Sequence, residues 1–313
     1  MTCNYCGCEE YNIVADCTRF EKNNVLQCKT CGLVYLEIKK GKAEIESFYS
    51  LEYRRVPTRP IRSPEELFYD NVTQNDASNR VLFISNHADI KDKRILEIGS
   101  ASGNLLEKLL EYGAGEVTGI ELDIELAKYV QQRGFKVFTR PIEELGFKEK
   151  FNTVVSFHTL EHVYDPMAVI QAVYVALRPG GFFLGEVPNQ DDWRIKIFDD
   201  EVAKRFHYDP NHYYYYSPTS LKNYLRTCGF GNINLETVER YNSLLQLRNI
   251  LQAGKSDEEV DEILERHLFP KTKTDEVRLP NLDNRIECEF NRVFETGVNS
   301  ELMGNCLRWV ARK

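Results

Sequence analysis

Hydrophobic and polar positions alternate along this chain in the rhythm of strands followed by helices. Between residues 94 and 188, short apolar runs are separated by segments whose apolar residues recur every three or four positions, as on one face of a helix. This alternation predicts an α/β fold, with a doubly wound, mainly parallel sheet covered by helices on both faces. The predicted strands are 94–98, 117–120, 135–138, 151–157, 182–187, 233–240 and 305–313, and the predicted helices are 124–134, 165–177 and one that begins after Gly103.

The turn that follows the first of these strands carries the strongest chemical signal. Glu97 lies in the strand, and the small residues Gly99-Ser100-Ala101-Ser102-Gly103 lead into the next helix. Such a turn brings backbone N–H groups and a helix N-terminus against a cofactor, and Glu121, at the end of the second strand, is placed for ribose hydroxyls. The spacing does not match the dinucleotide fingerprint G-x-G-x-x-G. The alternative interpretation of the turn is a β-α-β unit that binds no ligand and merely has a tight turn. The alternative role for Glu121 is to cap the following helix.

The pattern Glu97-x-Gly99-x-x-x-Gly103, followed by Glu121, resembles the first two motifs of class I S-adenosylmethionine-dependent methyltransferases. The resemblance implies a Rossmann-like fold with S-adenosylmethionine as the methyl donor. It departs at Ala101, where the family usually has glycine; alanine is tolerated there if its φ is negative and is mildly unfavourable otherwise. The donor-binding residues that the resemblance implies are Glu97, Gly99, Ser100, Ala101, Gly103, Asn104, Glu121, Leu122, Ile142, Glu143, Phe157 and His158.

The segment after the strand at 151–157 contains His158-x-x-Glu161-His162. It resembles the L-E-H-V segment of a branch of these enzymes that acts on small molecules, including quinones and sugars. Some quinone O-methyltransferases of this branch carry an E-x-x-E-H metal motif here, which implies a divalent-cation site at His158, Glu161 and His162. The alternative is that Glu161 and His162 hydrogen-bond to neighbouring loops.

A second histidine cluster occupies residues 207–217, with His207, His212 and four consecutive tyrosines at 213–216. It is similar to the loop that covers the substrate in the same branch. Histidine titrates near neutrality, so His212 or His207 could take a proton from an acceptor hydroxyl, while His158 faces the methyl donor. The tyrosines would supply aromatic walls for a sugar or ring. The alternative is a tyrosine-rich strand packed on the core.

Four of the nine cysteines form two matched knuckles, Cys3-x-x-Cys6-Gly and Cys28-x-x-Cys31-Gly. Each knuckle offers two thiolates, so together they predict a structural four-sulfur zinc site in a ribbon over residues 1–42, with strands at 25–27 and 33–36. A redox pair is the alternative for any single C-x-x-C. The cysteines outside the pattern are Cys8, Cys17, Cys228, Cys288 and Cys306, and the last three are predicted to be buried or inert thiols.

Residues 43–90 are predicted to be a connector with leading helices, since Ser63 and Pro64 begin a helix that continues to about His87. The methyltransferase domain covers 91–313. An insertion at about 241–300 is placed to shape the acceptor pocket, with helices at 244–252 and 255–266; the second is a solvated surface element or an oligomer contact, as in a homodimer. The connector residues that either line the mouth of the site or are simply solvated are Tyr49, Tyr53, Arg54 and Arg55.

Composition and charge indicate which classes of partner the protein is expected to lack. The chain has 313 residues, 42% hydrophobic and 28% charged, as in soluble globular proteins. Its net charge of −8 and pI near 5.5 provide no basic field for nucleic acid. No apolar run approaches the roughly 20 residues that span a bilayer, and the N-terminus lacks the regions of a signal peptide. We therefore expect a cytoplasmic protein without a membrane partner and with reduced cysteines.

These observations favour a methyltransferase with an N-terminal zinc ribbon that acts on a small-molecule hydroxyl, most simply on a nucleotide-linked or polysaccharide sugar. Two alternatives belong to other classes of protein. An RNA or ribosome methyltransferase would use the ribbon to grip nucleic acid, but acids and bases are almost balanced in residues 1–60. A non-catalytic binding module would keep the fold and would not bind the donor.

Overall fold

The structure is a computed structural model that describes residues 2–19, 21–37, 41–52, 62–198, 204, 207–240 and 284–313. Its helices are α1 (Lys42–Leu51), α2 (Pro64–Tyr69), α3 (Asn71–His87), α4 (Asn104–Glu111), α5 (Ile124–Gln132), α6 (Pro166–Ala176), α7 (Trp193–Phe198), α9 (Pro218–Thr227) and α12 (Asn284–Ser300). Its strands are β1 (Tyr11–Ala15), β2 (Val25–Cys28), β3 (Val34–Leu36), β4 (Arg94–Ile98), β5 (Glu116–Ile120), β6 (Lys136–Phe138), β7 (Phe151–Phe157), β8 (Leu177–Pro188), β9 (Tyr214–Tyr215), β10 (Gly231–Val238) and β11 (Cys306–Arg312).

A seven-stranded sheet forms the centre of the molecule, in the order β10-β11-β8-β7-β4-β5-β6. Strands β8, β7, β4, β5 and β6 are parallel, and β11 lies antiparallel between β8 and β10. The predicted α/β fold with a mainly parallel sheet is therefore confirmed. The chain proceeds from β4 to β5 and β6 on one side and then crosses back to β7 and β8, so the topology switches direction between β4 and β7.

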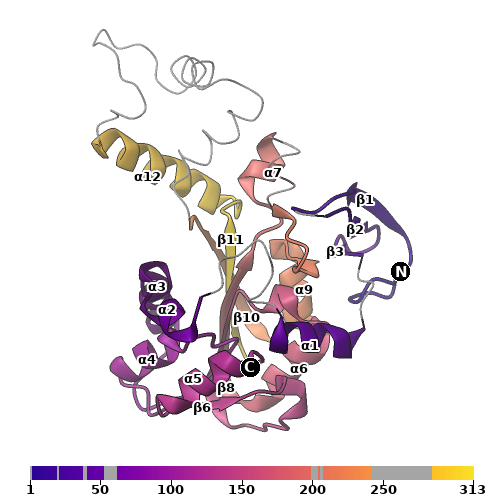
Figure 1. Ribbon diagram of the computed structural model, residues 1–313. Coiled ribbons are helices and arrows are strands. Elements are labelled where there is room, and N and C mark those ends of the chain that lie inside the picture. Colours follow the sequence, from indigo (N-terminus) through magenta and orange to yellow (C-terminus); the bar gives the residue numbers. More distant parts are fainter. Residues whose placement is uncertain are drawn as a thin grey trace.

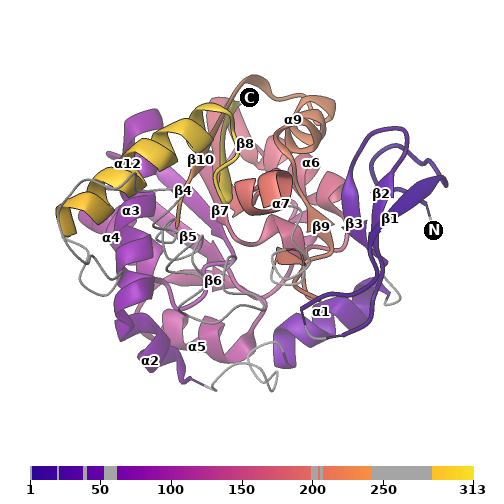
Figure 2. The ribbon, with the colours of Figure 1, turned by 90° about the horizontal axis from the view of Figure 1, so that it is seen from above.

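Helices cover both faces of this sheet (Figures 1 and 2). Neighbouring residues of β4 point to opposite faces, because side chains alternate along a strand: Ile95 packs with α3, α4 and α5, and Leu96 packs with α6 and α9. Both residues are fully buried. The central strands have continuous apolar runs because helices cover both faces of the sheet.

The leading helix that was expected to run from Ser63 to about His87 is two helices, separated at Asp70. Ser63 caps α2 through a capping box with Glu66, as predicted. The Asp70 backbone is extended, with φ −64° and ψ 129°, and its carboxylate accepts a hydrogen bond from the Thr73 N–H at 3.1 Å. Asp70 therefore ends α2 and caps α3, because its side chain replaces the helical partner of an N–H group in the first turn.

The N-terminal ribbon shares its sheet with the rest of the molecule. Strands β1, β2 and β3 form an antiparallel sheet whose fourth strand is β9, since Val34 pairs with Tyr215 and Tyr35 with Tyr214. Figures 1 and 2 show the ribbon against this segment, with α1 beside it. The predicted connector at 43–90 begins with the helix α1, which follows the ribbon.

Several expectations fall on parts of the chain outside the described residues: Tyr53, Arg54 and Arg55, and the helices at 244–252 and 255–266. Cys288 lies in α12, and its side chain is outside the description. The described end of the expected insertion is α12, and the terminal strand β11 follows it as predicted. Among the described helices, none has both the length and the apolar composition that a bilayer crossing requires.

Candidate active site

A cavity of about 440 Å³ opens at the carboxyl edge of the main sheet, at the switch between β4 and β7. This is where open parallel sheets place their ligands, because the connecting loops diverge there. Its walls come from the segments that follow β4, β5, β6 and β7, and also from α1 and the residue after β10. The lining includes Ile45, Tyr49, Arg80, Gly99, Ala101, Glu121, Leu122, Asp123, Ile142, Glu143, Phe157, His158, Thr159, His162 and Arg240.

The turn after β4 has a backbone that most side chains tolerate poorly. Gly99 and Gly103 have φ of 77° and 83°, and Ala101 also has a positive φ of 45°. A side chain at Gly99 would place its Cβ 2.2 Å from Thr159 Oγ1, so only glycine fits there. Ala101 therefore lies in the left-handed region, where its methyl group is unfavourable, and not at the negative φ that would tolerate it well.

The predicted donor-binding residues divide into those that line the cavity and those that support it. Gly99, Ala101, Glu121, Leu122, Ile142, Glu143, Phe157 and His158 line it, while Glu97, Ser100, Gly103 and Asn104 do not. Asn104 lies at the start of α4 and donates a hydrogen bond from Nδ2 to the Phe68 carbonyl at 2.7 Å. This hydrogen bond connects the turn after β4 to α2.

Glu121 projects from the end of β5 into the cavity. Its carboxylate accepts hydrogen bonds from the N–H groups of Ala101 and Asp123, each at 2.8 Å. The N-cap of α5 is Asp123, whose side chain accepts from Glu125 N and Leu126 N. Glu121 is thus not the side chain that caps this helix. Glu121 also lines the cavity, where a carboxylate can accept hydrogen bonds from hydroxyl groups of a ligand.

Glu97 lies beneath the cavity, in the middle of the sheet. Its side chain is buried, and Oε2 has no hydrogen-bond partner among the described residues. Burial raises the pKa of Glu97 to about 8; the Arg80 guanidinium lowers this pKa and the Glu121 carboxylate raises it, both to a smaller extent. The carboxyl group therefore binds its proton more tightly in the folded chain than in solution.

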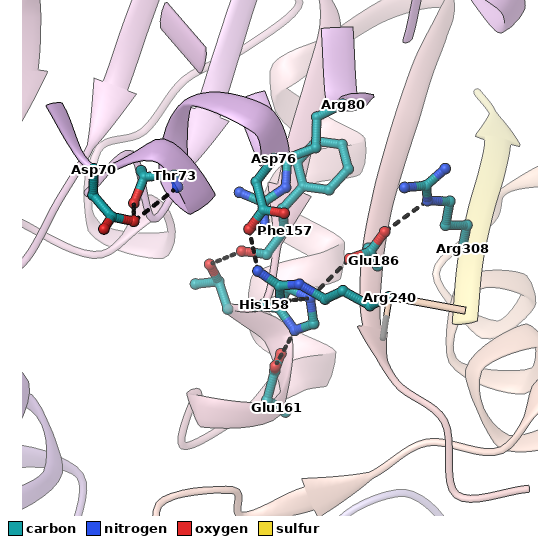
Figure 3. Close-up of polar contacts among 11 residues, drawn as sticks. Asp70, Thr73, Asp76, Arg80, Phe157, His158, Glu161, Glu186, Arg240 and Arg308 are labelled. Atoms are coloured by element: carbon teal, nitrogen blue, oxygen red, sulfur yellow. Dashed lines mark hydrogen bonds and ion pairs between the residues drawn. The ribbon is translucent and has the colours of Figure 1, made fainter. Parts of the chain in front are cut away.

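His158 connects the cavity to a network of charged residues (Figure 3). Its backbone has a φ of 51°, and its Nε2 lies 2.8 Å from Glu186 Oε1 and 2.9 Å from Arg240 Nη1. Burial alone lowers the pKa of His158, but hydrogen bonds to Cys306, Glu161 and Glu186 outweigh burial and raise that pKa well above its usual value. These hydrogen bonds therefore favour the charged form of the ring.

The charged network reaches α3 and β11. Arg240 forms an ion pair with Asp76 of α3, and Arg308 of β11 donates a hydrogen bond to Glu186 Oε2 at 2.6 Å. Arg80 lies over the Phe157 ring, 4.9 Å from its centroid. Sequence patterns did not point to Arg80, Asp76 or Arg240, because each is a single charged residue on a half-buried surface that becomes part of the site only through the packing of α3 against β10.

A second cavity, of about 460 Å³, lies on the other side of Arg80 and Arg240, which line both cavities. It lies between α3 and the ends of β8, β10 and β11. Charged side chains of both signs dominate its walls. They are Asp76, Arg80, Glu186, Glu236, Glu239, Arg240 and Arg308.

The predicted histidine and tyrosine cluster lies beside the first cavity, and none of its members lines that cavity. Burial lowers the pKa of His207 to about 4. The hydroxyls of Tyr214, Tyr215 and Tyr216 donate to the backbone carbonyls of Tyr164, Asp209 and Leu160. These tyrosines are buried and pack on the core, which is the alternative that the sequence left open.

The residues expected to hold a divalent cation form two clusters rather than one. Glu161 and His162 group with His212, and His158 groups with Glu186 and Cys306. His158 approaches Glu161 through Nδ1, which lies 3.4 Å from Oε1. The third potential ligand beside Glu161 and His162 is therefore His212, from the segment before β9.

The four knuckle cysteines converge at the far end of the ribbon. Cys3 Sγ and Cys31 Sγ are 3.6 Å apart, and Cys6 Sγ and Cys28 Sγ are 3.5 Å apart. All four sulfur atoms lie within 4.8 Å of one another. Sulfurs around a tetrahedral ion with Zn–S bonds of about 2.3 Å are about 3.8 Å apart, so this arrangement fits zinc.

Comparison with known proteins agrees with this geometry. A family model described as a methyltransferase domain matches residues 69–235. A ubiquinone biosynthesis O-methyltransferase from Xanthomonas euvesicatoria is 30% identical over 162 residues, which cover 48% of this chain and 67% of the relative. The enzyme of the same name from Nitrosococcus oceani is 32% identical over 181 residues, which cover 53% of this chain and 75% of the relative.

Among solved structures, a SAM-dependent methyltransferase from Archaeoglobus fulgidus superposes with a TM-score of 0.51 and 18% identity, covering 80% of this chain and 97% of the other. At this identity the superposition shows a shared fold only.

Proposed function

The chain belongs to the methyltransferase domain family, and on that premise we propose that it transfers the methyl group of S-adenosylmethionine to a hydroxyl group of a small molecule. It is a methyltransferase enzyme that uses S-adenosylmethionine. The observation that supports the proposed reaction most directly is the cavity at the ends of β4, β5 and β7, with Glu121 inside it. The O-methyltransferase names of the relatives favour an oxygen acceptor.

The residues of the cavity fit the donor. Glu121 lies at the end of β5 and lines the cavity, where its carboxylate can accept hydrogen bonds from ribose hydroxyls. Ile142, Leu122 and Phe157 offer apolar surface for a purine ring. Gly99 and Ala101 bring the backbone of the turn to the cavity wall, where a side chain would exclude the ligand.

For the acceptor we propose a sugar hydroxyl, in a nucleotide-linked or polysaccharide sugar. The second cavity supports this choice, because it shares Arg80 and Arg240 with the donor cavity and its walls are charged. Side chains of both signs can donate and accept the many hydrogen bonds that a sugar offers. A quinone-type acceptor would instead require an apolar surface, and it is the competing acceptor that the names of the relatives suggest.

Positioning supplies most of the proposed catalysis. The acceptor oxygen must approach the sulfonium methyl in line, and holding two reactants in that geometry lowers the barrier more than any single side chain does. His158 lines the cavity, its pKa is raised well above the usual histidine value, and its two ring nitrogens face Glu186 and Glu161. We therefore assign His158 the role of shaping the cavity wall beside the acceptor, rather than that of a general base. His207 and His212 lie behind the wall of the donor cavity. Either of them can act as the general base only for an acceptor that extends beyond this wall.

We further propose that Cys3, Cys6, Cys28 and Cys31 hold a structural zinc ion. Four thiolates leave no open position for a substrate, so the ion would stabilise the ribbon and take no part in the reaction. Cys8 and Cys17 lie outside this group.

The proposed donor site is tested by titrating the full chain with S-adenosylmethionine in a calorimeter. Glu121→Gln is expected to weaken binding by about tenfold or more, because a hydrogen bond to a charged group contributes about 1.5–3 kcal/mol. The matched control is Glu125→Gln, an exposed residue at the start of α5. Equal affinities in all three proteins would contradict the role of Glu121.

The acceptor is tested by measuring S-adenosylhomocysteine release with a panel of nucleotide sugars and small phenols. Turnover with a nucleotide sugar supports the proposed acceptor class. Turnover with phenols alone would overturn it and leave the methyltransferase activity intact.

A further inference from the structure

Helix α1 forms part of the wall of the donor cavity, although it precedes the catalytic sheet in the chain. Ile45, Glu46 and Tyr49 line the cavity together with residues from the segments after β6 and β7. These three residues share one face of the helix, because positions three and four apart lie side by side. Ile45 is buried, with 2% of its surface exposed. One side of the donor cavity is therefore closed by the helix that follows the ribbon.

Two polar contacts hold α1 across the cavity, one near each end. At the first residue of the helix, Lys42 Nζ lies 3.5 Å from Oε1 of Glu143, which follows β6. In the last turn, the Tyr49 hydroxyl donates to the Asn211 carbonyl at 2.9 Å and lies 2.9 Å from His162 Nδ1. Helix α1 thus connects the segments that follow β6 and β7, on two sides of the cavity.

The contact with Lys42 involves only one oxygen of Glu143. The other oxygen, Oε2, is buried and has no hydrogen-bond partner in the part of the chain that the structure describes. Glu143 also lines the donor cavity. A buried carboxylate oxygen without a donor is costly, so a ligand N–H group is expected to pair with it. The exocyclic amino group of an adenine offers such a donor. Lys42 therefore holds Glu143 where its second oxygen can meet the methyl donor.

Backbone hydrogen bonds connect the ribbon to the opposite wall of the cavity. The N–H of Leu36, the last residue of β3, donates to the Tyr213 carbonyl at 2.9 Å. The Tyr213 N–H donates in turn to the Glu161 carbonyl at 2.8 Å. Glu161 precedes His162, which lines the cavity. The position of the ribbon strand therefore affects the wall after β7 as well as α1.

Apolar packing connects α1 to the cysteine knuckles. Ile45 belongs to the same buried cluster as Leu36 of β3 and two of the knuckle cysteines, Cys3 and Cys28. Cys28 ends β2, and its N–H donates to the Leu33 carbonyl at 2.9 Å, so the second knuckle shapes the β2–β3 hairpin. A module as small as the ribbon buries too little apolar surface to be stable alone, and a bound metal ion then contributes to its folding.

We propose that α1 is part of the S-adenosylmethionine site and that the four-cysteine ribbon positions it, so that donor affinity depends on the metal of the ribbon. Ile45 supplies apolar surface to the bound donor, and Lys42 and Tyr49 hold two sides of the site at the separation that the donor requires. The ion takes no part in the chemistry and acts through the position of α1. This inference rests on the proposed donor site and on the proposed zinc ion.

The first test measures binding of S-adenosylmethionine to the full-length chain in a calorimeter. Ile45→Ala is expected to weaken binding by about tenfold, because the donor loses apolar contact with the helix. Tyr49→Phe keeps the ring and removes the hydroxyl that holds the end of α1, so it is expected to weaken binding by about fivefold.

Leu109→Ala is the matched control for lost stability. Leu109 is a fully buried residue of α4 that does not line the donor cavity, so its truncation lowers stability and should leave donor affinity unchanged. Tryptophan fluorescence during urea unfolding gives the stability of each variant. Equal donor affinity in Ile45→Ala and the wild type would overturn the role of α1. Equal weakening in Leu109→Ala would overturn it too, because lost stability would then explain the effect.

The second test removes the metal from the ribbon. Zinc is extracted from the wild-type chain with a chelator, and its release is measured together with the donor affinity. We expect donor binding to weaken by about as much as in Ile45→Ala and to recover when Zn²⁺ is added back. In Ile45→Ala itself, zinc removal should change the affinity little further, because both changes act on the same contact. Cys8→Ser, outside the four-sulfur group, is expected to keep the zinc and the donor affinity of the wild type.

The outcomes separate the ribbon from the reaction. Unchanged donor affinity without zinc would overturn the role of the ribbon, and equal weakening in the wild type and in Ile45→Ala would show that the coupling does not pass through α1. If the metal-free chain unfolds, Leu36→Ala replaces this arm: it removes a ribbon side chain of the same buried cluster and keeps the cysteines, and unchanged affinity would overturn the proposal. A wild-type chain that binds no donor would instead contradict the proposed function.

Discussion

At the scale of single residues, the most unusual group of the site is the carboxyl of Glu97, which is buried beneath the cavity with a pKa raised to about 8. The folded chain holds this proton more tightly than the unfolded chain does, so the stabilisation is complete below about pH 4.5 and is lost as the pH rises to 8. Glutamine at this position has the same shape and no charge to bury.

We therefore predict that Glu97→Gln gains stability relative to the wild type as the pH rises. The difference in the free energy of unfolding should grow between pH 5.5 and pH 8, by at most about 3 kcal/mol. Urea unfolding without the donor, at several pH values, measures it. The control is Glu111→Gln, an exposed residue of α4. If the two variants follow the wild type in parallel, burial does not perturb Glu97.

A second prediction concerns Ala101, whose φ of 45° lies in the left-handed region. Ala101→Gly should raise the free energy of unfolding by about 0.5–1 kcal/mol, because glycine adopts this conformation without strain. Ala172→Gly in the middle of α6 is the matched control and should lower stability by about 1 kcal/mol, since its backbone is helical. A loss of stability in both variants would contradict the strain at Ala101.

The spacing of Glu97, Gly99, Gly103 and Glu121 predicts a donor site at this turn, because a turn that follows a buried strand has few geometries; of the four, Gly99 and Glu121 line the cavity. The conformation of Ala101 could not be predicted, since the sequence does not record φ. The histidines show a similar limit: the sequence does not distinguish His158, His207 and His212, and only their burial and their partners separate the one that lines the cavity from those behind its wall.

At the scale of elements, local patterns predicted every central strand and failed at the junction of α2 and α3. Apolar positions continue through Asp70 with helical spacing, and the competing signal is short: an aspartate followed three residues later by Thr73. The break has a consequence for the site, because it aims the Phe68 carbonyl at Asn104, the first residue after the donor turn.

Asp70→Ala is predicted to lower the free energy of unfolding by about 1 kcal/mol, because Thr73 N loses its acceptor. Asp70→Asn keeps an oxygen that can cap the helix and is expected to stay close to the wild type. Urea unfolding compares the three proteins. Equal losses in both variants would show that the ion pair of Asp70 with Arg62 matters more than the cap.

At the scale of the whole molecule, the sequence divided the chain into a ribbon at 1–42 and a catalytic domain, and the structure joins them. The pairing of β3 with β9 links residues about 180 positions apart. No local pattern predicts such a contact. Leu26 and Val34 of the ribbon belong to the same buried cluster as Tyr224 of α9 and Trp309 of β11.

This shared core predicts that the ribbon and the main sheet unfold together. Both tryptophans of the chain, Trp193 and Trp309, are fully buried in the catalytic part, so their fluorescence reports on that part alone. Leu26→Ala removes a buried side chain from the ribbon strand β2 and should shift the tryptophan transition to lower urea, by about 2–4 kcal/mol. Ile13→Ala removes the side chain of a 58% exposed residue of β1 and should leave the transition almost unchanged. An unshifted transition in Leu26→Ala would mean that the ribbon melts on its own. A shifted one would explain how a distant cysteine cluster can hold α1, and with it Tyr49 and Ile45, at the wall of the donor cavity.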